Sequence, residues 1–182
     1  MQQARLLDYV SDKLIEGKVI GWYQGRAEYG PRALGNRSIL ADPKNPKMKD
    51  IVNSKIKFRE EFRPFAPMVL SRFAKKYFPG HDSTMTPFML ATYTASSAAK
   101  HAAPATVHVD GTSRIQTTDF PLLETFYKKT CLAGRRAGRP ILLNTSFNLK
   151  GEPIVNSPED AYRTFMKSGL DVLVLGNYVI LK

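Results

Sequence analysis

The chain has 182 residues, 43% of them hydrophobic, which is enough for one buried core and excludes a disordered protein. It has no run of about 18 apolar residues and no apolar signal-peptide centre, so we expect a soluble cytoplasmic protein with no membrane partner. Its 27 Lys and Arg residues against 16 Asp and Glu give a formal charge of +11, which favours polyanionic partners such as nucleotides, phosphorylated metabolites or RNA without separating them.

The first predicted elements are a helix, a strand and a loop. Apolar residues recur at helical spacing over residues 4–16, and Gly17 ends this helix. Residues 19–23 read as a buried strand, whereas residues 24–38 follow neither a helical nor a strand period. A second short helix is expected over residues 48–56.

The middle of the chain has weaker patterns. Two prolines make residues 63–70 extended or the edge of a sheet. Residues 80–105 are rich in small residues and read as a mobile, lid-like connection of unassigned role, part of which could form a strand. Residues 106–110 and 113–117 flank an Asp-Gly turn signal and therefore predict a β-hairpin.

The last third of the chain alternates helices and strands. We expect a helix over 120–137, a strand over 140–143, a helix from the N-cap Ser157 to Gly169, and strands over 172–175 and 178–181. No repeat or linker divides the chain, so residues 1–182 are predicted to be one domain of the α/β class, a mixed sheet covered by helices.

A loop rich in arginine and glycine occupies residues 25–38, GRAEYGPRALGNRS. Its arginines are Arg26, Arg32 and Arg37. Glycines let backbone N–H groups approach a ligand, and neighbouring guanidiniums repel one another unless an anion gathers them. The loop therefore predicts a phosphate or carboxylate site. The alternative is a surface loop in which the arginines pair with Glu28 and Asp42.

Two triplets share a polar-Phe-polar pattern, KFR at 57–59 and SFN at 146–148. Their polar members are Lys57, Arg59, Ser146 and Asn148. In an extended segment residues two apart share a face, which would turn Phe58 toward the core and the two cations toward one site. The second triplet follows a buried strand, where ligands bind in open α/β sheets. Either triplet alone is weak evidence, but together they suit a triphosphate held between the two segments.

A third polar group occurs in VHVDGTSRIQ, residues 107–116. Alternation with valine and isoleucine places His108 and Asp110 on one polar strand face and Arg114 and Gln116 on another, and these faces would border a pocket. The alternative is that Asp110 only makes the turn and that His108 is satisfied by Asp110 or by a backbone carbonyl. The sequence assigns no metal ligands, because the single cysteine has no partner at a metal-binding spacing.

Four segments in order resemble the C-terminal domain of the NodU-type O-carbamoyltransferases: GRAEYGPRALGNRSILADP, KFREEFRPFAP, HVDGTSRIQT and LLNTSFNLKGEPIV. The resemblance extends over residues 21–181. The KxR and SxN triplets also resemble the signature of YrdC-like domains, which make threonylcarbamoyl-adenylate for tRNA modification. The resemblance implies a YrdC-like open twisted mixed sheet with flanking helices.

The resemblance also implies an activity. Such a domain binds ATP, Mg²⁺ and carbamoyl phosphate, forms carbamoyl-adenylate and releases pyrophosphate. A larger N-terminal domain of the actin-like ATPase type, with iron held by histidines, then passes the carbamoyl group to a hydroxyl. That domain is not expected in this chain, so we expect binding and adenylation without completed transfer.

Carried over residue by residue, the resemblance implies three groups of site residues. Contacts to the phosphates of ATP and carbamoyl phosphate would come from Lys57, Arg59, Ser146 and Asn148. Further positive charge would come from Arg26, Arg32, Arg37 and Arg63. The remaining candidates for substrate or ATP binding are His108, Asp110, Arg114 and Asn144.

Two other functions stay open. The charge of +11 permits a threonylcarbamoyl-adenylate module for tRNA modification, and the chain could be a noncatalytic interaction domain. The long arginine-rich and HVDGTSRIQT segments match the carbamoyltransferase pattern and not that of the tRNA-modifying branch, which argues against a nucleic-acid partner. The sequence indicates neither the carbamoyl acceptor nor the oligomeric state.

Overall fold

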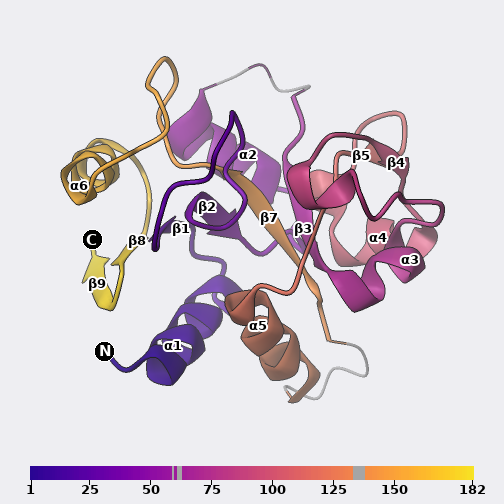
Figure 1. The fold of residues 1–182 in the computed structure, drawn as a ribbon, viewed down its shortest axis with the longest axis horizontal. Helices are drawn as coiled ribbons and strands as arrows, with labels where there is room; N and C mark the ends of the chain where they lie inside the picture. Colours follow the sequence, from indigo (N-terminus) through magenta and orange to yellow (C-terminus); the bar gives the residue numbers. More distant parts are fainter. Residues whose placement is uncertain (59, 61–62, 133–137) are drawn as a thin grey trace.

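A mixed seven-stranded sheet forms the centre of the computed structural model, which describes residues 1–58, 60, 63–132 and 138–182 (Figure 1). The strands are β1 (Ile20–Tyr23), β2 (Arg37–Ala41), β3 (Ala66–Leu70), β4 (Tyr93–Thr94), β5 (Thr112–Ser113), β6 (Gln116–Thr118), β7 (Ile141–Ser146), β8 (Val172–Leu175) and β9 (Tyr178–Leu181). The large sheet has the order β6-β3-β7-β2-β1-β8-β9, and β4 pairs with β5 in a separate two-stranded sheet. The predicted mixed sheet with flanking helices is confirmed.

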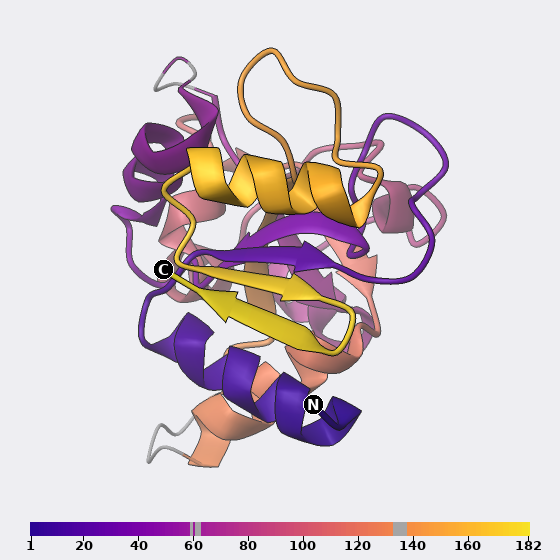
Figure 2. The same ribbon diagram turned by 90° about the vertical axis from the view of Figure 1, so that its left-hand side faces the viewer.

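Helices cover both faces of the sheet (Figure 2). The α-helices are α1 (Gln3–Ile15), α2 (Met48–Val52), α3 (Ala74–Tyr77), α4 (Ser97–Ala102), α5 (Pro121–Leu132) and α6 (Pro158–Lys167). Short turns of other helix types are the π-helix η1 (Asn53–Lys57) and the 3₁₀-helices η2 (Ser71–Phe73), η3 (Thr86–Phe88) and η4 (Pro104–Thr106). Within these described elements, none is long and apolar enough to cross a bilayer.

The sheet separates two hydrophobic cores. On one face Val52 of α2 and Phe165 of α6 pack in one cluster, and on the other Leu14 of α1 and Phe126 of α5 pack in a second. A third cluster lies under α3 and α4 beside β3. Burial of each large apolar side chain contributes about 1.5–3 kcal/mol before the loss of conformational entropy is counted.

The terminal elements agree with the sequence. α1 covers the predicted helix and is followed by Gly17, whose N–H donates to Leu14 O. Ser157 caps α6 through a reciprocal capping box with Asp160, because each side chain accepts the other residue's backbone N–H. β8 and β9 form the expected antiparallel hairpin. The predicted helix over 120–137 is confirmed from Pro121 to Leu132, and residues 133–137 are outside the described part.

One strand prediction was wrong, and a second was confirmed in its extended alternative. Residues 37 and 38 were assigned to a loop, yet β2 begins at Arg37 and all five of its residues are buried. Burial on both faces removes the polar alternation that identifies a strand. Residues 63–70 were expected to be extended or at an edge; β3 is extended but lies inside the sheet between β6 and β7. Its ladder with β6 begins at Met68, so the N–H missing at Pro67 does not interrupt that pairing.

The predicted hairpin around Asp110 was also wrong. Residues 104–106 form η4, and the chain then turns so that His108 N–H donates to Thr112 O at 2.8 Å. Gly111 takes a positive φ of 81°, which confirms the Asp-Gly turn itself. The strands beyond it pair elsewhere: β5 with β4, and β6 in parallel with β3.

The segment expected as a mobile lid over residues 80–105 is a packed unit of η3, β4, α4 and part of η4. Its small residues serve close packing, since Ala95, Ala99 and Ala103 are buried in the same cluster as Tyr77 and Phe78. The suggested strand within it is β4.

Candidate functional site

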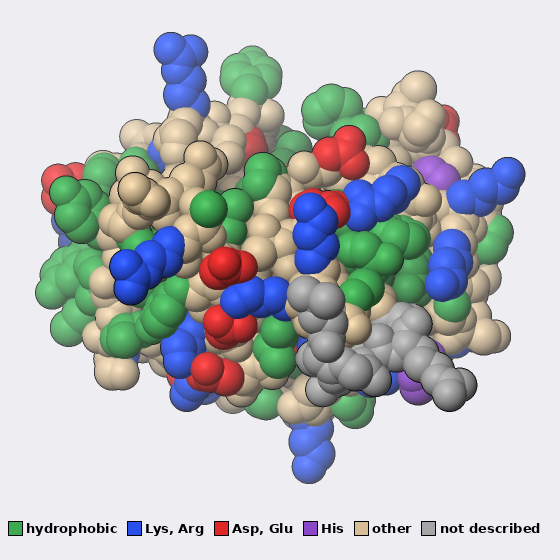
Figure 3. Space-filling model, turned by 90° about the horizontal axis from the view of Figure 1, so that it is seen from below, with side chains coloured by type: hydrophobic (Ala, Val, Ile, Leu, Met, Phe, Trp, Pro, Cys, Tyr) green, Lys and Arg blue, Asp and Glu red, His purple; other side chains and the backbone are tan. Residues whose placement is uncertain are grey.

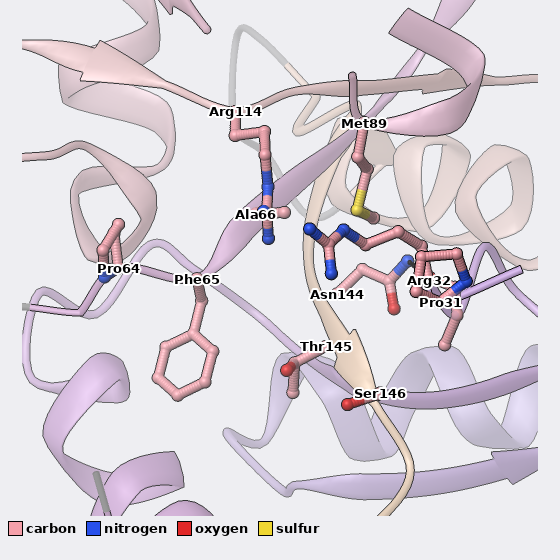
Figure 4. A pocket seen from close by; sticks show the side chains of 11 residues that line it. Pro31, Arg32, Pro64, Phe65, Ala66, Met89, Arg114, Asn144, Thr145 and Ser146 are labelled. Atoms are coloured by element: carbon pink, nitrogen blue, oxygen red, sulfur yellow. Dashed lines mark hydrogen bonds between the residues drawn. The ribbon is translucent and has the colours of Figure 1, made fainter. Parts of the chain in front are cut away.

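Two adjoining cavities open where β7 ends and β3 begins. The smaller, about 100 Å³, is shown in Figure 4. It is lined by Pro31, Arg32, Ala33, Pro64, Phe65, Ala66, Met89, Arg114, Asn144, Thr145 and Ser146. The larger, about 530 Å³, is lined by Arg32, Arg63, Pro64, Phe65, Ala66, Thr92, His108 and Arg114. Five lining residues are shared, so the two spaces form one candidate site at the carboxyl end of a buried strand.

Two arginines from different segments face both cavities. Arg32 comes from the loop between β1 and β2, and Arg114 lies between β5 and β6; Figure 4 shows both side chains directed into the space. Burial lowers the pKa of Arg114, and the charge of Arg32 lowers this pKa further. Among the described residues no carboxylate forms an ion pair with either arginine. Two guanidiniums held near one another favour the binding of an anion between them.

Glu28 shapes the loop that presents Arg32. Its Oε1 accepts the backbone N–H of Leu34 at 2.6 Å and of Asn36 at 2.7 Å, which folds the loop over the carboxylate. Gly35 takes a φ of 129°, a conformation that other residues rarely adopt. Asp42, the other carboxylate proposed to neutralise the loop, pairs with Arg139 at 2.6 Å. Both acids therefore bind groups other than the three loop arginines.

Lys57 joins the two predicted triplets. Its ammonium group is buried and donates to Ser146 O at 2.6 Å, Asn148 Oδ1 at 2.7 Å and Asn148 O at 3.0 Å. The Ser146 hydroxyl in turn donates to Asn148 Oδ1 at 2.7 Å. The predicted meeting of the two segments is confirmed for Lys57. Arg59, the other cation of the triplet, lies outside the described residues.

The local structure around Lys57 differs from the expected extended segment. Lys57 is the last residue of the π-helix η1, and Phe58 follows with a φ of 47°. Phe58 is 57% exposed, so the prediction that it faces the core was wrong. Lys57 lines neither cavity, whereas Ser146 lines the smaller one. The lysine therefore fixes the chain that follows β7 and acts on the cavity through Ser146.

A chain of side-chain amides closes the floor of the smaller cavity. Asn144, which is 1% exposed, donates from Nδ2 to Ala33 O at 3.0 Å and to Gln116 Oε1 at 2.8 Å. Gln116 donates from Nε2 to Leu34 O at 2.7 Å. These bonds tie β7 and β6 to the arginine loop. Gln116 was not predicted as a site residue, although its polarity within an apolar alternation was the available signal.

Two further predicted residues border the larger cavity. Arg63 forms an ion pair with Glu60, with Nε and Oε2 3.4 Å apart. His108 contacts Thr112 Oγ1 through Nδ1 at 3.1 Å. Burial lowers the pKa of His108, and the charge of Arg114 adds to this effect against the opposing charge of Asp110. The imidazole is therefore neutral at pH 7 and offers the cavity a hydrogen-bonding group without charge.

Besides Lys57 and Asn148, three further predicted residues line neither cavity. Arg37 is buried, donates to Gln24 O at 2.7 Å and stacks 3.5 Å from the Tyr23 ring centroid, which makes it a packing residue. Asp110 accepts the backbone N–H and hydroxyl of Thr112, and these bonds lower its pKa. The alternative in which Asp110 serves the turn is thus supported. Arg26 is exposed and borders neither space.

The donor set of the site suits anions better than direct metal coordination. The described lining residues of the two cavities include arginines, amides, hydroxyls and one imidazole but no carboxylate. Across the same described part of the chain, no group of three or more His, Cys, Asp or Glu residues could hold a metal ion. Mg²⁺ prefers carboxylate and phosphate oxygens, so a magnesium ion here would depend on the phosphates of its ligand.

Comparison with protein families and curated sequences gives concordant matches. The family described as the carbamoyltransferase C-terminus matches residues 11–182. The nodulation protein NolNO of Sinorhizobium fredii is 46% identical over 180 residues, which cover 98% of this chain and 26% of that protein. The 3'-hydroxymethylcephem-O-carbamoyltransferase of Amycolatopsis lactamdurans is 35% identical, covering 93% of this chain and 32% of the enzyme. The chain thus spans about a quarter to a third of these relatives.

Solved structures share the fold at low sequence identity. Full-length HypF, crystallised in a phosphate- and nucleotide-bound form, superposes with a TM-score of 0.66 and 15% identity, over 94% of this chain and 25% of HypF. Escherichia coli YciO superposes with a TM-score of 0.59 and 11% identity, over 98% of this chain and 88% of YciO.

Proposed function

Because the chain belongs to the carbamoyltransferase C-terminal family, we propose that it binds ATP and carbamoyl phosphate and forms carbamoyl-adenylate. The observation that carries the proposal is the pair Arg32 and Arg114 at a cavity that Ser146 also borders and whose described lining contains no carboxylate. Such a cavity suits a ligand with several phosphate oxygens.

The proposed reaction has two steps. Water cleaves carbamoyl phosphate to carbamate and inorganic phosphate. A carbamate oxygen then forms a bond to the α-phosphorus of ATP, the bond from that phosphorus to the bridging oxygen breaks, and pyrophosphate leaves with the electron pair. The reaction needs no covalent protein nucleophile, so the protein contributes positioning and charge neutralisation.

The residues of the site divide these tasks. Arg32 and Arg114 neutralise charge that builds on the phosphoryl oxygens, and Lys57 holds Ser146 and Asn148 in position. Loss of one such charge-assisted contact raises the barrier by about 2–4 kcal/mol. Mg²⁺ bound to the nucleotide would supply further neutralisation of the phosphates.

We further propose that transfer of the carbamoyl group to a hydroxyl takes place on a separate N-terminal domain of the actin-like ATPase type. The proposal is supported by the relatives, in which the matched region is only about a quarter to a third of the length. The name of the Amycolatopsis relative describes an enzyme that carbamoylates a hydroxymethyl group.

A pyrophosphate-release assay tests the adenylation proposal. We expect release only when ATP, Mg²⁺ and carbamoyl phosphate are present together. Release that requires threonine and bicarbonate instead would support a threonylcarbamoyl-adenylate module. No release under either condition, from folded protein, would support a noncatalytic interaction domain.

A further inference from the structure

Resting on the proposed function, we infer that Asn144 selects the carbamoyl group by accepting a hydrogen bond from its amino group. The site would thereby distinguish carbamoyl phosphate from acyl phosphates of the same shape. In acetyl phosphate a methyl group replaces the amino group, so the two ligands differ mainly in whether they present an N–H donor.

The orientation of the Asn144 amide is fixed by its neighbours. Both hydrogens of Nδ2 are used, one by Ala33 O at 3.0 Å and one by Gln116 Oε1 at 2.8 Å. Gln116 cannot rotate freely, because its own Nε2 donates to Leu34 O at 2.7 Å. Rotating the Asn144 amide by half a turn would set Oδ1 against two acceptors. The side chain therefore presents an acceptor in the remaining direction.

That acceptor has no hydrogen-bond partner among the described residues. Asn144 Oδ1 is buried and unpaired, although Asn144 lines the smaller cavity beside Arg32 and Arg114. Figure 4 shows the oxygen on the side of Thr145 and Ser146, with the Arg32 side chain beside it. A buried acceptor left unsatisfied destabilises a protein by about 1–3 kcal/mol, and its pairing with a ligand donor recovers that free energy.

The surroundings suit a carbamoyl group in this position. A cavity of about 100 Å³ admits a group of a few heavy atoms and not a nucleoside. The two arginines on its wall would hold the attached oxygens while Oδ1 receives the N–H. Oδ1 has little direct access to solvent, so its pairing with a ligand requires a local shift of the cavity wall. Arg32 is exposed and would move toward the anion.

The test compares the affinities of two isosteric ligands by calorimetry. We expect the protein to bind carbamoyl phosphate about 10- to 100-fold more tightly than acetyl phosphate. Asn144→Leu keeps the branched shape of the side chain and removes the acceptor, so the preference should fall to near unity whatever the change in affinity for acetyl phosphate. Equal affinities in the original protein, or an unchanged preference in folded Asn144→Leu, would overturn the inference.

A second variant covers the case in which Asn144→Leu does not fold. Gln116→Met leaves Asn144 in place but removes the bonds that fix its amide, so the preference should fall several-fold. A full preference in folded Gln116→Met would contradict the orienting role of Gln116 and with it the inference.

Failure of the proposed function has a different signature. A preference for carbamoyl phosphate without pyrophosphate release would leave the Asn144 inference standing and reject adenylation. Pyrophosphate release at equal rates with both acyl phosphates would support adenylate formation and reject the selection by Asn144.

Discussion

Two regions of the molecule use basic residues in opposite ways. On the face that carries α1 and α5, Lys and Arg side chains alternate with Asp and Glu (Figure 3). Lys129 of α5 pairs with Asp12 of α1 at 2.7 Å, and Arg72 pairs with Glu124 at 2.6 Å. Exposed pairs of this kind contribute about 0–1 kcal/mol each, and they leave little field to attract a ligand.

The smaller cavity beside β7 brings together two arginines that form no ion pair with a carboxylate of the described residues. Arg114 is half-buried next to Arg32, and burial together with the charge of Arg32 lowers the pKa of Arg114. Glu28, the acid nearest in sequence, is used by backbone N–H groups. The net charge of +11 therefore says less about function than the place where positive charge is left uncompensated.

Removing one cavity arginine should have the largest effect. We expect Arg114→Ala to lower kcat/KM for pyrophosphate release by about 30- to 1,000-fold, which corresponds to about 2–4 kcal/mol of transition-state stabilisation. Chemical denaturation should show unchanged or slightly raised stability, because a partly desolvated cation beside Arg32 is lost. The matched control is Lys129→Ala on the ion-paired face, which should leave kcat/KM unchanged.

Replacing Lys57 should lower both the stability of the protein and its activity. In Lys57→Met the oxygens of Ser146 and Asn148 lose a buried donor, so the free energy of unfolding should fall by about 2 kcal/mol. Pyrophosphate release should fall as well, since Ser146 borders the cavity. Normal stability with lost activity would instead indicate that Lys57 contacts the ligand directly.

Glu28 is an acid that holds the arginine-rich loop by accepting backbone N–H groups and forms no ion pair with its arginines among the described residues. We expect Glu28→Gln to weaken the two bonds to backbone N–H groups and to lower the free energy of unfolding by about 1 kcal/mol. KM for ATP should rise a few-fold while kcat changes less, because Arg32 is less well positioned. A lower KM would show that the negative charge of Glu28 opposes ligand binding.

The smallest expected effect is a dependence on pH. The pKa of His108 is lowered by burial, so the folded protein binds this proton less readily than the unfolded chain, whose histidine titrates near pH 6.5. The stability associated with neutral His108 is present above about pH 6.5 and is lost as the pH falls through the lower pKa of the folded state. His108→Asn should flatten the decline in melting temperature between pH 7 and pH 5. An identical decline in both proteins would assign it to other groups.

Some of the site followed from the sequence. The matched triplets predicted that their two segments would face one site with an anion between them. Lys57 does reach Ser146 and Asn148, but from the end of a π-helix and by direct hydrogen bonds. Arg32 and Arg37 could not be separated, since both lie in one glycine-rich segment. What distinguishes them is that β2 begins at Arg37 and buries it, and strand pairing of this kind depends on distant residues.

The wrong hairpin has a similar cause. The Asp-Gly signal is local and was correct, but the choice of strand partners was not local. β6 pairs with β3, which lies about 50 residues earlier in the chain. The residues around His108 therefore have no strand partner in β6, and they form a turn instead of a strand. Gln116 was expected on a polar strand face but was left out of the site residues, because its role depends on Asn144 and on the arginine loop.

The most direct test of whether the cavity lined by Arg32 and Arg114 binds ATP is calorimetry. ATP with Mg²⁺ is titrated into the original protein, Arg114→Ala and Lys129→Ala. The account predicts tight binding to the original protein and to Lys129→Ala, and binding weakened at least tenfold in Arg114→Ala. At a hundredfold excess over Kd, ATP should stabilise the first two by about 2.7 kcal/mol. Equal weakening by both substitutions, or none by Arg114→Ala, would contradict it.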